Sequence, residues 1–339
     1  MKHLDAVRER TEDLERASLS TWATLASESK GRDRFEEADP LRTAFQVDRD
    51  RITDTRAFRR LRDKTQVVIA AGGDHRRDRL THTLEVTQVA RTMARGLRLN
   101  EDLVEAIALG HDLGHTAFGD AGEEALSIFT AAPFRHHEQS VRVVEHLEHL
   151  EQGGSGLNLT WEVRDGILNH TSGTPAPATA EGQVVRLADR VASLAYDLAD
   201  ACAVGIVRTR NVPDDVVGTL GATTAGRIAT AIRDVVTVSI DRPDVRMSPP
   251  VTVALDRLRA FLDTALYQRP MASAERDRAI HSLRSLVVFF LENPERMPAE
   301  HHGAAPTETR VLDYVSGLTD GDVLRTFAAV FLPGRDPSA

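Results

Sequence analysis

Apolar residues of this chain recur at intervals of three and four positions, and this spacing constrains the fold more than any other feature. Such spacing places apolar side chains along one face of a helix. One stripe runs from Leu80 to Leu97, and Asn100 stands before a second stripe as a helix N-cap. Strand signals are weak throughout the sequence. The pattern therefore predicts an all-α protein.

The same periodicity predicts nine further helices, at about 121–130, 137–151, 160–170, 183–203, 213–237, 251–267, 273–292, 306–316 and 319–331. We expect three regions along the chain. A charge-dense arm over 1–45, extended or in short helices, packs on the main body or on a neighbouring subunit. A helical core spans 46–205, and a C-terminal helical region over 206–339 completes the fold.

Charge and cysteine content limit the classes of function. The net charge of −9 argues against a protein that mainly grips nucleic-acid phosphates, so any bound anion needs a local site. The single cysteine, Cys202, excludes an intramolecular disulfide and a cysteine metal cage. No signal-peptide-like stretch and no run of 18 apolar residues occurs. These features predict a cytoplasmic protein with no membrane partner.

Histidines gather in one part of the chain. Nine of the 13 lie within about 96 residues: His75, His82, His111, His115, His136, His137, His146, His149 and His170. Taken alone, His111-Asp112 fits a helix-end histidine beside an exposed aspartate. Its context favours a metal site, because it ends an apolar helix, His82 lies on a neighbouring helix, and Asp189 interrupts an apolar run. Two imidazoles and two carboxylates suit Mn, Mg, Fe, Ni or Zn, with room for water and a phosphate oxygen.

Several separated motifs agree in order with one family. They are Gly73-Asp74-His75, Arg79-Leu80-Thr81-His82-Thr83-Leu84-Glu85-Val86, Gly110-His111-Asp112-Leu113-Gly114-His115 and Gly156-Leu157-Asn158-Leu159-Thr160-Trp161-Glu162-Val163. From about residue 31 to 203 the chain resembles the bacterial dGTP triphosphohydrolase family of HD-domain metal-dependent phosphohydrolases. The resemblance implies an all-α fold and hydrolysis of a deoxynucleoside triphosphate at the α-phosphorus, which gives a deoxynucleoside and tripolyphosphate. It also implies a homo-oligomer, a tetramer or hexamer, that a dNTP or single-stranded nucleic acid could regulate.

The resemblance assigns roles to individual residues. His82, His111, Asp112 and Asp189 would hold one divalent ion, Mn or Mg in the first place and otherwise Fe, Co, Ni or Zn. Glu123, with His115 or Asp120, would handle the proton, and His136 would face the phosphates. The substrate would be bound by Arg59, Gln66, Val67, Arg79 and Asp197, with Gln66 and Asp197 near the sugar.

Three positions depart from the family pattern. Asp120 stands where the family has a histidine before Ala-Gly-Glu, and Ser193 and Arg76 replace two tyrosines. An additional carboxylate would oppose a polyanion unless a metal or arginines screen it. These changes leave two alternatives open: an HD-type hydrolase of another nucleotide phosphoester, and a nucleotide-responsive binding protein without turnover.

Overall fold

The computed structural model describes residues 5–66, 77–150, 153–267 and 270–333. These ranges contain helices and isolated β-bridges but no strand, which confirms the all-α prediction. No helix in them has the length and apolar composition needed to cross a membrane. In chain order the helices are α1 (Asp5–Ser18), α2 (Ala44–Thr53), α3 (Arg56–Arg60), α4 (Arg79–Leu97), α5 (Glu101–Gly110), α6 (Asp120–Ser127), α7 (His136–Arg142), α8 (Trp161–Asn169), α9 (Ala180–Ala203), α10 (Asp214–Leu220), α11 (Thr224–Ser239), α12 (Pro249–Leu262), α13 (Pro270–Glu292), α14 (Thr307–Gly317) and α15 (Asp320–Phe331).

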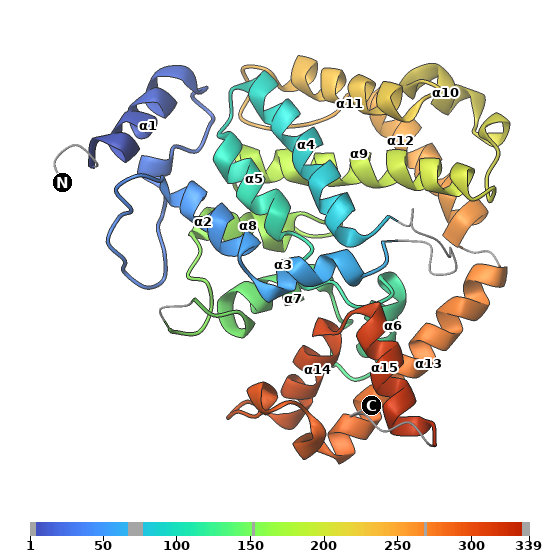
Figure 1. Ribbon diagram of the computed structural model, residues 1–339. Helices are drawn as coiled ribbons and strands as arrows, with labels where there is room; N and C mark the ends of the chain where they lie inside the picture. Colours follow the sequence, from blue (N-terminus) through green and yellow to red (C-terminus); the bar gives the residue numbers. More distant parts are fainter. Residues whose placement is uncertain (1–4, 67–76, 151–152, 268–269, 334–339) are drawn as a thin grey trace.

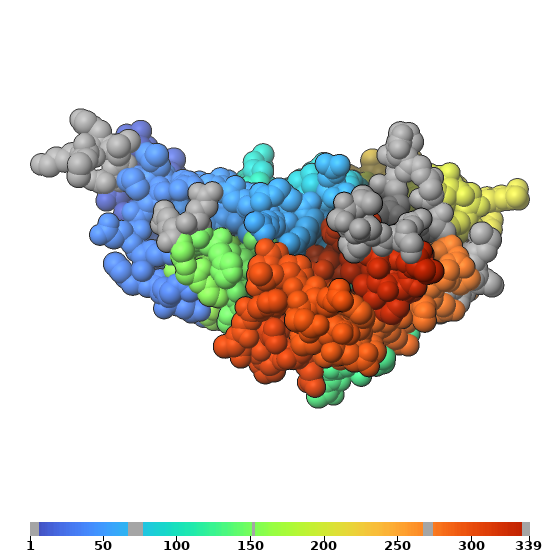
Figure 2. Space-filling model, turned by 60° about the horizontal axis from the view of Figure 1, so that its bottom comes forward, coloured from blue at the N-terminus to red at the C-terminus, as the bar shows by residue number. Residues whose placement is uncertain are grey.

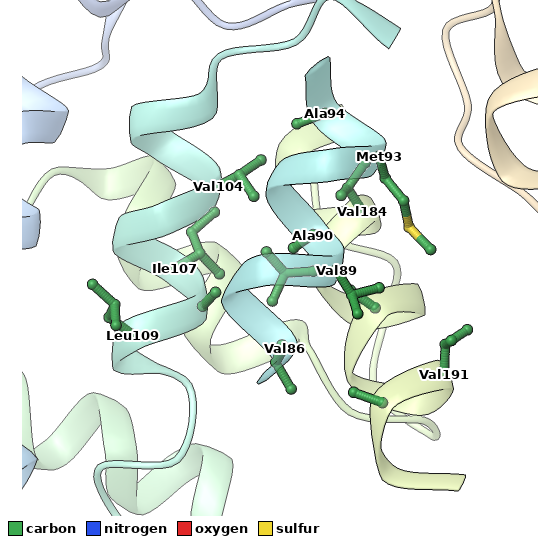
Figure 3. Packing of buried hydrophobic residues seen from close by; sticks show 14 of the residues in the cluster. Val86, Val89, Ala90, Met93, Ala94, Val104, Ile107, Leu109, Val184 and Val191 are labelled. Atoms are coloured by element: carbon green, nitrogen blue, oxygen red, sulfur yellow. The ribbon is translucent and has the colours of Figure 1, made fainter. Parts of the chain in front are cut away.

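The larger hydrophobic core lies between α4, α5 and α9 (Figure 1). Figure 3 shows part of this core from close by, where Val89 and Met93 of α4 lie near Ile107 of α5 and Val184 of α9. These side chains are all buried because the apolar residues of each helix fall on its inward face. This three-helix packing brings the C-terminal end of α5 and the first turn of α4 beside the middle of α9.

Polar caps set the ends of the helices in this core. The Asp78 carboxylate accepts a hydrogen bond from Thr81 N (2.7 Å) and starts α4. The helix ends at Arg98, whose φ of +53° is left-handed. The Asn100 side chain then accepts from the backbone N of Asp102 and Leu103 and starts α5, as the sequence predicts.

A second core joins α6 to α13, α14 and α15 near the C-terminus (Figure 1). In Figure 2 these last helices, orange to red, form the lower face of the molecule. In the first core, α11 instead packs on α4 and α9, α12 packs on α9, and α10 packs on α11 and α12. The predicted C-terminal region, 206–339, therefore contributes to both cores.

Two predicted helices differ from the structure. The range 213–237 is divided into α10 and α11, because Gly221 adopts a φ of +101° that a helix does not accommodate. The range 137–151 is helical only to Leu147, and its second half, Val143–Leu147, is a π-helical turn. The periodicity of apolar residues located both segments but did not show these breaks.

Buried carboxylates hold the N-terminal arm on the main body. Glu181 of α9 accepts hydrogen bonds from Thr24 N (2.9 Å), Thr24 Oγ1 (2.8 Å) and Asn100 N (3.1 Å). Glu162 of α8 accepts from Lys30 N (2.7 Å) and Ser29 Oγ (2.7 Å). The arm is thus tied to the same helices that carry the core. Contact with a neighbouring subunit stays a prediction.

The loop after α5 touches the backbone of α7. A Cβ added to Gly114 would lie 2.2 Å from Ser140 N, 2.3 Å from Gln139 C and 2.7 Å from His136 O. The loop and the helix are also joined by hydrogen bonds from Gly114 N to Ser140 Oγ (2.9 Å) and from Ser140 Oγ to His111 O (2.7 Å). The missing side chain of Gly114 therefore sets how closely α7 approaches the end of α5.

Replacing Gly114 with alanine should push α7 away from this loop, since only backbone atoms face the new methyl group. We expect Gly114→Ala to lower the free energy of unfolding by about 2–4 kcal/mol in urea denaturation. Gly303→Ala is the control, because a Cβ there meets nothing within 4 Å. Equal stability of the two variants would show that α7 is not held by this contact.

Candidate metal centre and active site

Three predicted metal ligands meet at the ends of two helices. His82 lies in the first turn of α4, and His111 and Asp112 follow the last residue of α5. All three are buried, and one ligand atom from each lies within 4.8 Å of the other two. The packing of α4 against α5 in the core positions them.

The state of His111 fits a metal ligand. Its Nδ1 donates a hydrogen bond to Ala108 O (2.7 Å), which leaves a lone pair on Nε2. That Nε2 is buried without a hydrogen-bond partner among the described residues, and it faces Asp112 Oδ2 at 3.5 Å. An unpaired buried nitrogen is costly unless a ligand occupies it. The donor set of imidazole and carboxylate suits a divalent transition metal or Mg²⁺.

Asp189 of α9 lies against His82. Its Oδ1 is 3.1 Å from His82 Nε2, where a cation bound by both atoms would replace the shared proton. Burial raises the pKa of Asp189, but the hydrogen bond and charge of His82 outweigh it and hold that pKa well below its usual range. Asp189 is therefore an ionised carboxylate beside the three converging ligands.

Arg79 connects the candidate metal ligands to Gln66, in the segment before α4. Its Nη1 donates to Asp112 Oδ2 (2.7 Å), and its Nη2 donates to Gln66 O (3.4 Å). The buried Arg79 thus neutralises part of the charge on Asp112. Although burial raises the pKa of Asp112, His111 and Arg79 keep it well below its usual range. Val67, the other residue predicted here, lies outside the described residues.

A second histidine group faces the opposite oxygen of Asp112. His136 Nε2 lies 3.8 Å from Asp112 Oδ1, and the ring of His115 stacks on His136 with centroids 4.5 Å apart. His136 Nδ1 donates to Glu123 Oε1 at 2.5 Å, and His136 N donates to the same oxygen at 2.8 Å. Burial lowers the pKa of His136, but the bond to Glu123 outweighs it and raises that pKa. Glu123 and His136 therefore form a pair suited to moving a proton.

The sequence reasoning missed His170, which completes this group. Its Nε2 lies 3.3 Å from His136 Nε2, and its ring centroid lies 4.9 Å from that of His111. Its Nδ1 bonds to Ile167 O (2.8 Å), three residues back. His111 bonds to Ala108 O in the same way. A histidine placed directly after the last residue of a helix was thus a signal shared by both residues.

Other predicted site residues lie elsewhere. Arg59 is exposed and donates to Asp54 O (2.9 Å). Asp120 is exposed in the first turn of α6, so its part in proton handling rests on the resemblance alone. Asp197 is buried and accepts a hydrogen bond at 2.7 Å from Arg77, a residue that sequence reasoning did not select.

Arg77 links Asp197 and two further carboxylates to His82, one of the candidate metal ligands. Its guanidinium also pairs with Glu85 (2.8 Å) and Asp200 (3.1 Å), and it contacts His82 Nδ1 at 3.1 Å. Burial raises the pKa of Glu85 to about 7, against the opposing charge of Arg77. Asp197 thus belongs to a charged cluster that contacts His82 through Arg77, at the ring nitrogen Nδ1.

Two protein-family models match this chain. A model described as HD domain matches residues 79–194, and one described as phosphohydrolase-associated domain matches residues 245–329. The chain is 49% identical over 330 residues to a deoxyguanosinetriphosphate triphosphohydrolase-like protein of Caldanaerobacter subterraneus subsp. tengcongensis, with 96% of each chain covered. A protein of the same description from Clostridium perfringens is 43% identical over 338 residues, covering 96% of this chain and 98% of its own.

Among solved structures, a hypothetical protein from Aquifex aeolicus is similar at 19% identity. The match has a TM-score of 0.47 and covers 84% of this chain and 71% of that one.

Burial of His170 predicts that the stability of the protein depends on pH in the acid range. Burial first, and then the neighbouring His111 and His136, lower the pKa of His170 from 6.5 to about 3. The native state therefore holds this imidazole neutral, whereas the unfolded chain protonates it below pH 6.5. Stability from this group is present above pH 6.5 and is lost as the pH falls toward 3.

We expect metal-free wild type to lose unfolding free energy more steeply than His170→Gln over this range, by up to about 1.4 kcal/mol per pH unit. Urea denaturation in a chelator, at several values between pH 4 and 7, measures both slopes. His146→Gln is the control, because that imidazole is exposed. Identical slopes for wild type and His170→Gln would exclude a neutral buried His170.

Proposed function

Because the chain belongs to the dGTPase-like proteins of the HD-domain phosphohydrolase family, we propose that it is a metal-dependent dNTP triphosphohydrolase. It would cleave the substrate at the α-phosphorus and release a deoxynucleoside and tripolyphosphate. The observation that carries this proposal is the position of Asp112. One of its oxygens faces the ligands His82 and His111, and the other faces the proton-transferring His136.

His82, His111, Asp112 and Asp189 would hold the ion. A divalent ion bound there supplies Lewis acidity toward a phosphate oxygen and lowers the pKa of a bound water. Mn²⁺ and Mg²⁺ are the first candidates, and Fe, Co, Ni and Zn suit the same donor set. Asp112 is ionised at neutral pH, so the site attracts a cation before any protonation change is needed.

The other side chains would bind and move protons around the substrate. Arg79, which is paired with Asp112, and His115 would offer buried nitrogen donors to the phosphates, where charge develops during the reaction. Glu123 orients His136 through its Nδ1, which leaves Nε2 as the atom that transfers a proton. Asp120, exposed at the start of α6, would exchange protons with solvent.

Product analysis tests the reaction together with the metal site. Full-length protein with Mn²⁺ or Mg²⁺ and each of the four dNTPs should give tripolyphosphate and a deoxynucleoside in equal amounts by ion chromatography. His111→Ala should lose both the bound ion, measured by elemental analysis, and turnover, while its circular dichroism stays helical. His146→Ala keeps both. Orthophosphate or pyrophosphate as product would contradict the proposal, as would tight dNTP binding without any product.

The pair of Glu123 and His136 gives a separate test. Glu123→Gln keeps the size of the side chain but removes the charge that raises the pKa of His136. We expect kcat to fall by roughly 10²–10⁴-fold, with unchanged metal content. Glu124→Gln is the matched control, since the neighbouring Glu124 is exposed and pairs with Arg276. Equal kcat for the two variants would remove Glu123 from the catalytic apparatus.

A further inference from the structure

The start of α15 contacts two loops that border the candidate active site. Asp320, the first residue of this helix, is only 6% exposed. Its Oδ1 accepts a hydrogen bond from Phe118 N at 2.9 Å. Its Oδ2 accepts from Thr65 N at 3.0 Å and from Thr65 Oγ1. One carboxylate therefore joins two loops that are distant in sequence, 64–66 and 116–119.

The loop over 116–119 needs such support. Phe118 has a φ of +59°, a left-handed conformation that a non-glycine residue holds only when its surroundings fix it. Gly119 follows with a φ of +61°, and a Cβ there would lie 3.2 Å from Arg79 Nη2 and 3.3 Å from Gln66 O. The turn thus packs directly against the arginine that binds Asp112. It also leads into α6, which carries Glu123.

Lys64 makes a second connection between the same parts of the chain. Its side chain is 1% exposed, and its Nζ donates to Ser316 O at 3.0 Å and to His115 O. Ser316 belongs to α14, four residues before Asp320. The end of α14 and the start of α15 are therefore hydrogen-bonded to these loops at two points, Ser316 and Asp320. In Figure 2 red surface from the last helices borders light blue surface from the N-terminal part of the chain.

We propose that Asp320 is a positioning residue for the phosphohydrolase reaction. It fixes the two loops against each other, so that Arg79 and Glu123 keep their orientation toward the phosphates. The phosphohydrolase-associated region then forms part of the catalytic apparatus, although none of its residues needs to touch the substrate. This inference rests on the proposed function, because Arg79 and Glu123 take their roles from it.

The chemistry of the contact requires a carboxylate. The three donors named above point at the two oxygens, and an ionised carboxylate is an acceptor at both. An asparagine has a single acceptor oxygen and would turn an NH₂ group toward either Phe118 N or Thr65 N. One loop would then lose its anchor while the size of the side chain stays the same.

Asp322 lies in the same turn of α15, and its variant is a control that distinguishes a positioning role from an effect on stability. Its Oδ2 accepts from Thr319 N (3.2 Å) and Thr319 Oγ1 (2.7 Å) in a capping box, which holds the helix start but neither loop. If Asp320 served only to fold the second core, Asp320→Asn and Asp322→Asn would lower activity in proportion to stability. A positioning role affects kcat in Asp320→Asn alone.

The experiment uses the full chain loaded with Mn²⁺, with dGTP as substrate. We expect Asp320→Asn to lower kcat by roughly 10–100-fold with KM within about threefold and metal content unchanged. Hydrogen exchange should become faster in peptides over 112–120 but not in α5. Asp322→Asn should keep kcat within about twofold at a comparable loss of melting temperature. Thr65→Val, which removes one of the three donors, should give a smaller loss of kcat.

Three results would overturn the inference. They are unchanged kcat and exchange in Asp320→Asn, a parallel loss of kcat in Asp322→Asn, and a loss of bound Mn²⁺ in Asp320→Asn. If Asp320→Asn does not fold, the same criteria apply to Thr65→Val. Wild type that releases no tripolyphosphate would refute the proposed function instead, and the exchange of 112–120 in the variants would then decide the positioning role.

Discussion

The structure of the site depends on a buried ionised carboxylate, Asp112. Moving such a charge out of water costs several kcal/mol unless charges or hydrogen bonds compensate it. Here Oδ2 receives the guanidinium of Arg79 and faces His111 and His82, while Oδ1 faces His136. These partners come from α4, from the end of α5 and from α7. The core packing of these helices is therefore also the condition under which Asp112 can stay charged.

Helix ends supply most of the functional side chains. His111 and His170 each follow the last residue of a helix and bond back to the carbonyl oxygen three residues earlier, so that Nε2 points into the site. In each case the final carbonyls of a helix, which lack intrahelical partners, fix a histidine tautomer. Gly114 then lets α7 approach closely enough for His136 to reach Asp112. The backbone thus defines the chemistry of the imidazoles before any ligand binds.

The sequence predicted the helical class and the group of His82, His111 and Asp112, because apolar periodicity and short sequence motifs are local signals. It could not show His170 as a partner of His136, since their contact joins residues 34 positions apart through the packing of α7 on α8. Asp320 lies 255 positions from Thr65, and nothing local distinguishes it from Asp322, the neighbouring carboxylate that caps the helix. Which of two nearby aspartates turns inward is decided only by tertiary packing.

Charge balance links the metal to the substrate. The chain carries a net charge of −9, and the site itself contains the carboxylates of Asp112, Asp189 and Glu123. Arg79 is already paired with Asp112, and Lys64 donates to two carbonyl oxygens, so the described basic groups closest to the cluster are largely committed. A triphosphate with about four negative charges would meet repulsion there unless a divalent cation offset the carboxylates. In the proposed reaction the cation is therefore required for binding the substrate as well as for activating water, and the two requirements act through the same residue, Asp112.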